Sequence, residues 1–398
     1  MGQPAIIVSV VAPADLVFGL STTDAPVVVV LVAARLLVPL AIPRVPLLIV
    51  VALVIDAADQ TLLAALTEVD TTETGPYQSV DKALDVYYLS IAYLSTMRNW
   101  TSDAAFRVAQ FLFYYRLAGS MLFELTDARL MLLLFPNTFE FFFIAYELVR
   151  LRREPSRFTA RFWLFTGAGL WVFVKLPQEY WIHIAKLDFT DAVRDYPAFG
   201  AAALLPLLVA AVVLVRVVYP RLPAPDWEWR LTADRLPTSL VEAHARYARR
   251  LQSGRVLTRE AFEQVWLLGL ICIIFASILP GVDATVPQIA AGVATIVFAT
   301  AAISLAAARR GGFGPTSAAG RYAALLATNV VLIYLANALL GDRRTFEIEL
   351  GLFFGFLVTT LIWLYDAFRP VYDQRFGGSS LRVESIGDLL RRVQERRP

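Results

Sequence analysis

The chain has 398 residues, of which 58% are hydrophobic and only 18% are charged. An ordinary soluble domain carries roughly 25% charged residues, so this chain lacks the polar surface that a soluble fold of its length needs. The formal net charge of +2 gives no strongly basic surface for a nucleic-acid partner. Cys272 is the sole cysteine, which excludes an intramolecular disulfide and a cysteine-based metal site.

Long apolar runs, separated by short loops rich in arginine, extend over most of the chain. About 20 apolar residues cross a hydrocarbon core, and lipid requires each helix to bond its own backbone groups. The runs therefore predict an all-α, polytopic integral membrane protein with about 11 transmembrane helices (10–12). We expect spans at 25–42, 44–65, 79–98, 104–124, 128–149, 158–176, 197–219, 261–280, 284–308, 319–340 and 346–368, and a re-entrant, interfacial or twelfth spanning segment at 4–20.

The arginine-rich loops predict how the chain is oriented, because cytoplasmic loops carry an excess of basic residues. Arginines at 150–161, in 220–260, at 309–310 and in the tail after 390 all fall on one side of the predicted membrane. Lysine is confined to Lys82, Lys175 and Lys186, which is typical of a G+C-rich bacterial genome. We therefore expect a multi-pass protein of a bacterial plasma membrane with its C-terminus in the cytoplasm.

Four parts follow from this pattern. Residues 1–219 are expected to form an N-terminal membrane bundle and 261–368 a C-terminal one, with a cytoplasmic connector at 220–260 and a basic tail at 369–398. Ser239 with Glu242, and Ser385 with Asp388, can each begin a short amphipathic helix in the connector and the tail. Such arginine-rich helices suit an anionic inner leaflet, and simple solvated connectors are the alternative.

The second predicted span carries acidic residues between two apolar stretches. Asp56, Asp59 and Gln60 are spaced i, i+3, i+4, so they share one helix face. Each aspartate inside a membrane costs roughly 2.5–3.5 kcal/mol on a translocon scale. The span therefore needs partners for these side chains.

The third predicted span supplies a second acidic face, with Gln78, Asp81, Asp85 and Tyr88 at helical spacing. The second span ends where the third begins, so the two aspartate pairs are expected to meet near the outer leaflet. Four carboxylates repel one another unless a divalent cation, a lysine such as Lys82, or protons compensate. Hard oxygen ligands suit Mg²⁺, Mn²⁺ or Ca²⁺. The candidate catalytic residues and metal ligands, with Mg²⁺ or Mn²⁺ as the expected cofactor, are Asp56, Asp59, Asp81 and Asp85.

This layout resembles that of the CDP-alcohol phosphotransferases, which place Asp-x-x-Asp at the end of one span and Asp-x-x-x-Asp at the start of the next. The likeness covers only residues 56–85. Gln60 stands where that family has glycine, the family's Ala-Arg pair is missing, and Gly75 lies too far ahead of Asp81. That family also works at the cytoplasmic face. The resemblance implies a similar arrangement of ligands and no more.

Two other readings of the acidic residues remain open. In the first, they are neutralised by nearby arginines or by Lys82 and only join helices; the available basic residues are Arg35, Lys82, Arg98 and Arg107. In the second, they belong to a proton or ion pathway.

Two further features carry candidate functional residues. Arg116 and Glu140 lie mid-span in neighbouring predicted helices and are expected to pair, and Pro136 can kink its helix and free a carbonyl. The outer segment 175–188 combines ionisable residues with aromatics, either as a lid over the aspartates or as an interfacial anchor. The candidate substrate-binding residues are Gln60, Gln78, Lys82, Tyr88, Arg116, Glu140, Lys175, Glu179 and His183.

The sequence favours a membrane-embedded enzyme, such as a metal-dependent transferase, that acts on a lipid-linked or phosphorylated substrate at the outer side of the membrane. An ion- or proton-coupled transporter is the first alternative, and a non-catalytic scaffold that binds another membrane protein is the second. The expected partners are a membrane lipid or lipid-linked substrate, and anionic inner-leaflet lipids at the basic helices.

Overall fold

The computed structural model describes residues 25–67, 76–126, 128, 130–180, 212, 216, 223–234, 259–278, 285–309, 318–340 and 348–376. Every regular element in these ranges is a helix, which confirms the predicted all-α class. The predicted segment 4–20 and both predicted amphipathic helices lie outside the described residues, and only two residues of 197–219 lie inside them.

The helices of the N-terminal part begin and end close to the predicted spans. They are α3 (Ala25–Leu37), the 3₁₀-helix η1 (Pro39–Ala41), α4 (Leu48–Leu66), α5 (Pro76–Asn99), α6 (Asp103–Thr126), α7 (Leu130–Leu134), α8 (Thr138–Arg150), the 3₁₀-helix η2 (Pro155–Arg157), α9 (Ala160–Leu170), the π-helix η3 (Trp171–Lys175) and α10 (Leu176–Glu179). The C-terminal part contains α14 (Arg259–Ile278), α15 (Val286–Arg309), α16 (Ala318–Leu340) and α17 (Ile348–Phe376).

One predicted span proves to be two helices. The apolar run 128–149 is interrupted at 135–137, between α7 and α8. Pro136 lacks an N–H group and disfavours a helical conformation for Phe135. The interruption therefore follows from one residue, and it lies close to the polar residues of the bundle.

The predicted number of about 11 spans is not confirmed. In the described part of the chain, two helical stretches are long and apolar enough to cross a membrane, Leu130–Arg150 and Leu352–Phe376. Shorter apolar stretches occur at Pro26–Ala41, Ala261–Ser277, Val286–Ala302 and Tyr322–Leu335. The helices α5 and α6 carry charged residues that reduce their apolar character.

Helix α5 is the centre of the fold. Its residues from Ala83 to Met97 are nearly all buried, and α3, α4, α6, α14 and α17 all pack against it. The buried hydroxyls of Ser90 and Ser95 donate to the carbonyls of Val86 and Ala92 in the same helix. These local hydrogen bonds allow polar residues in a helix that protein encloses on all sides.

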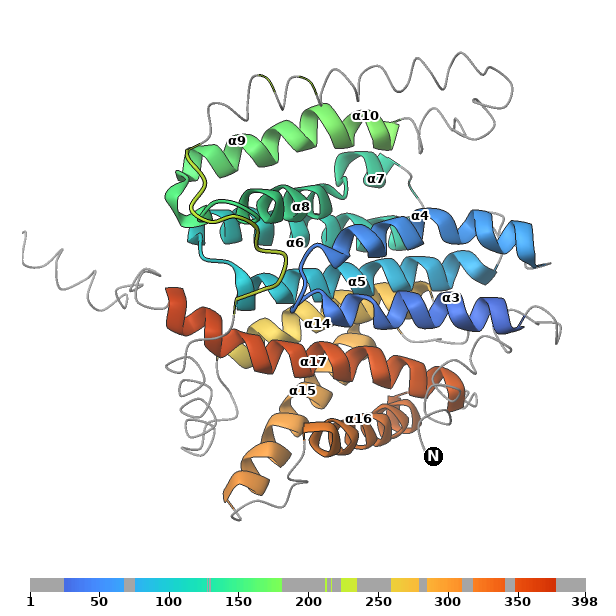
Figure 1. The fold of residues 1–398 in the computed structure, drawn as a ribbon. Coiled ribbons are helices and arrows are strands. Elements are labelled where there is room, and N and C mark those ends of the chain that lie inside the picture. Colours follow the sequence, from blue (N-terminus) through green and yellow to red (C-terminus); the bar gives the residue numbers. More distant parts are fainter. Residues whose placement is uncertain are drawn as a thin grey trace, which may run out of the picture.

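The helices run roughly side by side in layers, from α9 at one side of the bundle to α15 and α16 at the other (Figure 1). Helix α17 lies along α5, and α14 packs against α5 and α6. The N-terminal and C-terminal helices therefore share one interior, and α5 contacts both groups.

One end of the bundle is closed by side chains from three segments. The indole of Trp100 donates to Glu147 at 3.0 Å, and Arg150 donates to the same carboxylate at 2.5 Å. Arg150 also donates to the carbonyl of Thr232 at 3.1 Å, while the indole of Trp227 donates to the carbonyl of Arg150 at 3.0 Å. The segment 223–234 of the connector is thereby fixed to the end of α8.

We predict that Gly119→Ala destabilises the fold, because a Cβ at this position in α6 would overlap the Cβ of Phe135 at the α7–α8 break. Overpacking of this kind costs about 1–3 kcal/mol. Thermal unfolding in detergent, followed by tryptophan fluorescence, should show a lower transition temperature. Gly292→Ala in α15 is the matched control, since no side chain or other helix among the described residues lies within 4 Å of its added Cβ. An equal or higher transition temperature for Gly119→Ala would contradict the described break.

Candidate functional site

The acidic residues predicted to meet do come together, on the facing surfaces of three packed helices. Asp56 and Asp59 lie on α4, and Asp81 and Asp85 lie on α5. Helix α3 packs against both helices and contributes Arg35. We call these four aspartates and Arg35 the acidic cluster. The side-chain positions of Gln60 and Gln78, which sit beside it in sequence, lie outside the description.

The guanidinium of Arg35 contacts all four carboxylates. Its Nη1 donates to Asp59 and Asp81, and its Nη2 donates to Asp56 and, at 2.5 Å, to Asp85. The Arg35 side chain is only 3% exposed. Arginine suits this place because it is planar, stays ionised and presents several donors at once.

The other basic residues considered as counter-charges have other partners. Lys82 pairs with Glu124 at 3.3 Å, and Arg107 pairs with Asp103 at 2.9 Å. Arg98 donates to the carbonyl of Pro43 at 2.9 Å.

Charge in the acidic cluster is unbalanced. Four carboxylates and one guanidinium leave a formal charge of −3 when every aspartate is ionised. A guanidinium has five N–H donors, whereas four carboxylates have two oxygens each. Arg35 therefore cannot satisfy every carboxylate oxygen by itself, and a cation or protons would lower the remaining charge.

Burial divides the four aspartates into two kinds. The Asp59 side chain is 2% exposed, whereas those of Asp56, Asp81 and Asp85 are 23%, 25% and 38% exposed. Asp59 thus lies on the buried side of Arg35. The other three carboxylates form an open side from which an ion can approach.

The open side has the geometry of a cation site. One oxygen each from Asp56, Asp81 and Asp85 lie within 4.8 Å of one another. Ligand oxygens lie about 2.0–2.6 Å from Mg²⁺ or Ca²⁺, so oxygens that share one ion are separated by no more than about twice that distance. These three residues can hold a metal ion, and Asp59, which was predicted as a fourth ligand, is not part of this group.

A second group of polar residues surrounds the start of α8. The hydroxyl of Tyr88, on the face of α5 that carries Asp85, donates to Glu140. The side-chain amide of Asn137 donates to the other oxygen of Glu140 at 3.2 Å, and its backbone N–H donates to Glu179 at 3.3 Å. Tyr88 therefore connects the neighbourhood of the acidic cluster with the interruption between α7 and α8.

The predicted ion pair between Arg116 and Glu140 is not formed. Arg116 donates instead to the carbonyl of Phe135 at 3.2 Å, while Glu140 is bound by Tyr88 and Asn137. The carbonyl of Phe135 is accessible because the helix ends beside Pro136. The kink that the sequence suggested thus determines which acceptor Arg116 uses.

Lys175 is a buried cation in this second group. It is the last residue of the π-helix η3 and is 5% exposed. Its ammonium lies 4.4 Å from the centre of the Phe141 ring. The described part of the predicted lid, up to Tyr180, packs against α7 through α10; His183 lies outside the described residues.

The two groups lie at different places along their helices. At 1.5 Å per residue, Asp85 and Tyr88 lie about 21 and 17 Å from the Asn99 end of α5, and Glu140 lies about 15 Å from the Arg150 end of α8. Arg116 lies about 20 Å along α6 from Asp103 by the same rule. Glu140 is thus at the start of α8, whereas Asp81 and Asp85 lie in the first half of α5. Their position near the outer leaflet stays a prediction.

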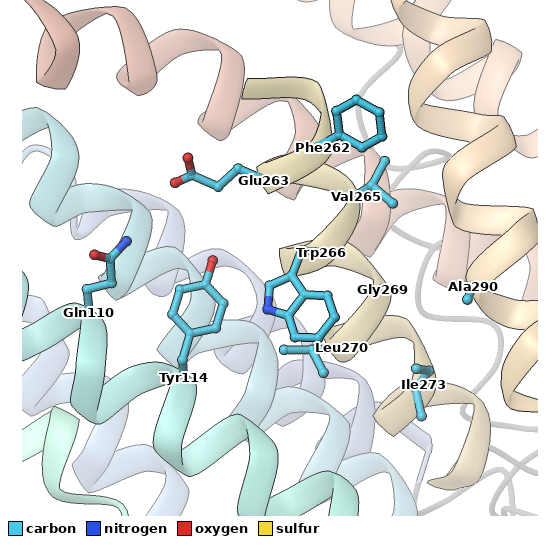
Figure 2. A pocket seen from close by; sticks show the side chains of 10 residues that line it. All are labelled: Gln110, Tyr114, Phe262, Glu263, Val265, Trp266, Gly269, Leu270, Ile273 and Ala290. Carbon is cyan, nitrogen blue, oxygen red and sulfur yellow. The ribbon is translucent and has the colours of Figure 1, made fainter. Parts of the chain in front are cut away.

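A groove of about 750 Å³, which no sequence pattern predicts, lies between α6, α14 and α15. Tyr114 on α6 and Trp266 on α14 lie side by side in it, and Ile273 and Ala290 line its other end (Figure 2). Its one carboxylate, Glu263, pairs with Arg369 at 2.5 Å. The groove is mainly apolar and is separate from the acidic cluster.

No known protein family matches the chain, and neither a curated protein nor a solved structure shows significant similarity to it. The acidic cluster and the polar group at the start of α8 are therefore the features that bear on its function.

We predict that Arg35→Met strongly destabilises the protein, because it leaves four facing carboxylates without their shared cation. Removing one partner of a buried ion pair typically costs about 3–5 kcal/mol. Arg107→Met is the matched control: its side chain is 50% exposed, and surface pairs contribute at most about 1 kcal/mol. Thermal unfolding in detergent should separate the two variants, and equal transition temperatures would show that Arg35 does not hold the cluster together.

Proposed function

We propose that this protein is a membrane-embedded enzyme that binds Mg²⁺ or Mn²⁺ at Asp56, Asp81 and Asp85 and acts on a lipid-linked or phosphorylated substrate. The observation that carries the proposal is the unbalanced charge of the acidic cluster. Three partly exposed carboxylates share one guanidinium, and their oxygens lie within 4.8 Å of one another. A divalent cation would neutralise most of the excess charge.

Each residue of the cluster has a distinct part in this mechanism. Arg35 holds the carboxylates of α4 and α5 in position, and the buried Asp59 fixes Arg35 from the inner side. Asp56, Asp81 and Asp85 would provide the hard oxygen ligands that these ions prefer. A bound divalent cation would supply Lewis-acid polarisation of a phosphoryl oxygen.

The membrane setting of the proposal rests on two candidate spanning stretches and on the uneven distribution of arginine in the loops. A cluster midway along the helices can be reached by a substrate that is itself anchored in lipid. We place the substrate-facing side at the outer side of a bacterial plasma membrane, opposite the arginine-rich segments.

Ion- or proton-coupled transport is the second candidate. It is favoured by the hydrogen bond from Tyr88 to Glu140, which joins the region of the acidic cluster to a second buried carboxylate. Ionisable residues at this depth are typical of ion and proton pathways. The two candidates differ in whether a covalent change in a lipid accompanies cation binding.

We expect the purified full-length protein to bind Mn²⁺, and Asp81→Asn and Asp85→Asn each to weaken that binding by about tenfold or more, which corresponds to about 1.4 kcal/mol. Each substitution removes one charged ligand from a three-carboxylate site. Isothermal titration calorimetry gives the affinity and the stoichiometry. Asp103→Asn is the control, because Asp103 pairs with Arg107 away from the cluster. Unchanged Mn²⁺ affinity in both cluster variants would overturn the cation site.

The reaction itself can be tested in vesicles made from a ³²P-labelled bacterial lipid extract. We expect the wild-type protein to convert a labelled lipid in the presence of Mn²⁺, and both EDTA and Asp85→Asn to stop the conversion. A cation flux through the vesicle membrane without any change in the lipids would overturn the enzyme and support the transporter.

A further inference from the structure

The start of α8 is an unusual helix terminus because it lies inside the bundle. Helix α8 has 13 residues and follows Pro136, and its N-cap residue Asn137 makes no capping hydrogen bond with its side chain. The first N–H groups of a helix have no partner within the helix. They also carry the positive end of the helix dipole, so they attract anions.

Two oxygen atoms at this terminus are buried without a hydrogen-bond partner. They are Oγ1 of Thr138, a residue only 1% exposed, and Oδ1 of Asn137. A buried polar atom that makes no hydrogen bond costs about 1–3 kcal/mol. The hydroxyl of Thr138 can donate, so a ligand with acceptor oxygens would satisfy it.

A buried positive charge lies in the same region. Within the described part of the chain, the ammonium of Lys175 makes no hydrogen bond and no ion pair within 4 Å, and it lies against the Phe141 ring. The contact with Phe141, the fourth residue of α8, places the ammonium beside the first turn of that helix. An ammonium has three N–H donors, and all three are available to a ligand.

The carboxylates beside Lys175 are already engaged. Glu140 accepts from Tyr88 and from the amide of Asn137, and Glu179 accepts from the backbone of Asn137. Arg116, which donates to the carbonyl of Phe135 through Nη1, adds a second positive charge. These two cations balance the two glutamates, and the dipole of α8 adds partial positive charge.

Aromatic rings line this region. The Tyr115 ring packs on Phe135 and on Trp171, with ring centroids 4.4 and 4.9 Å away, and Phe141 lies against Lys175. Electrostatic attraction to the buried ammonium is stronger than it would be in water.

We infer that Lys175, Arg116 and the first turn of α8 form a site for the phosphate group of the substrate. The inference rests on the proposed function, because it supplies an anion-binding site for the phosphorylated substrate proposed there. A phosphate has several acceptor oxygens, which match donors on three separate elements: η3, α6 and α8. The substrate class is thereby narrowed to phosphate esters bound jointly by a cation at the acidic cluster and by Lys175.

The arrangement also implies coupling between the two sites. Asp56 interacts electrostatically with both Lys175 and Glu140, so neutralising the acidic cluster with a cation removes repulsion of an incoming phosphate. Mn²⁺ should therefore increase the affinity for phosphate, and phosphate should increase the affinity for Mn²⁺ by the same factor.

The test is equilibrium dialysis of the full-length protein with ³²P-labelled inorganic phosphate, with and without Mn²⁺, alongside a separate titration of Mn²⁺ alone. Lys175→Met should weaken phosphate binding by about tenfold or more, as expected for the loss of a charge-assisted hydrogen bond of about 1.5–3 kcal/mol. Its Mn²⁺ affinity should stay close to that of the wild type. Arg161→Gln is the matched control, because Arg161 is an exposed basic residue on α9, in the same continuous helical run as Lys175.

Thr138→Val, which removes one hydroxyl at nearly constant volume, provides a second variant if Lys175→Met does not fold, and it should also weaken phosphate binding. The phosphate site is overturned if the wild type binds Mn²⁺ but no phosphate, or if both variants bind phosphate like the wild type. Phosphate binding that depends on Lys175, in a protein that binds no Mn²⁺, would support the phosphate site and overturn the cation site of the proposed function.

Discussion

The contact between one guanidinium and four carboxylates determines the arrangement of this protein's interior. Arg35 on α3 bonds to two aspartates on α4 and two on α5, so these three helices cannot slide or rotate independently. In a medium of low dielectric constant, separating any of these charges from Arg35 is strongly unfavourable. The position of α5 at the centre of the fold depends on this contact. So does the placement of Tyr88, which follows Asp85 by one turn.

The two polar groups differ in charge although both include residues of α5. The acidic cluster carries excess negative charge, whereas at the start of α8 Lys175 and Arg116 balance Glu140 and Glu179, and the helix dipole adds partial positive charge. In the proposal, a cation binds at the acidic cluster and the phosphate of the substrate binds at the start of α8. The side chain of Tyr88 lies between the groups and hydrogen-bonds to only one of them, Glu140.

Helix positions and the shared faces of the aspartates were predictable from the sequence, because apolar length and i, i+3, i+4 spacing are local properties. The partners of these aspartates were not predictable from the sequence. Arg35 was one of four possible counter-charges, and only the packing of α3 against α4 and α5 selects it. The separation of Asp59 from the three open carboxylates depends on how far α4 is rotated, which spacing alone does not determine. The sequence predicts a pair between Arg116 and Glu140 because both lie in the middle of neighbouring spans. It does not predict that Arg116 instead uses the carbonyl of Phe135, which the helix break at Pro136 leaves free.

The position of the Lys175 side chain depends on the π-helix that ends at this residue. A π-turn holds one residue more than an α-turn and has poorer hydrogen bonding. If η3 returned to regular α-helical geometry, every residue after it would turn by about 100° around the helix axis. Lys175 and the residues of α10 that follow it, Glu179 included, would then turn relative to α8. The extra residue of the π-turn thus sets the direction in which the Lys175 side chain points.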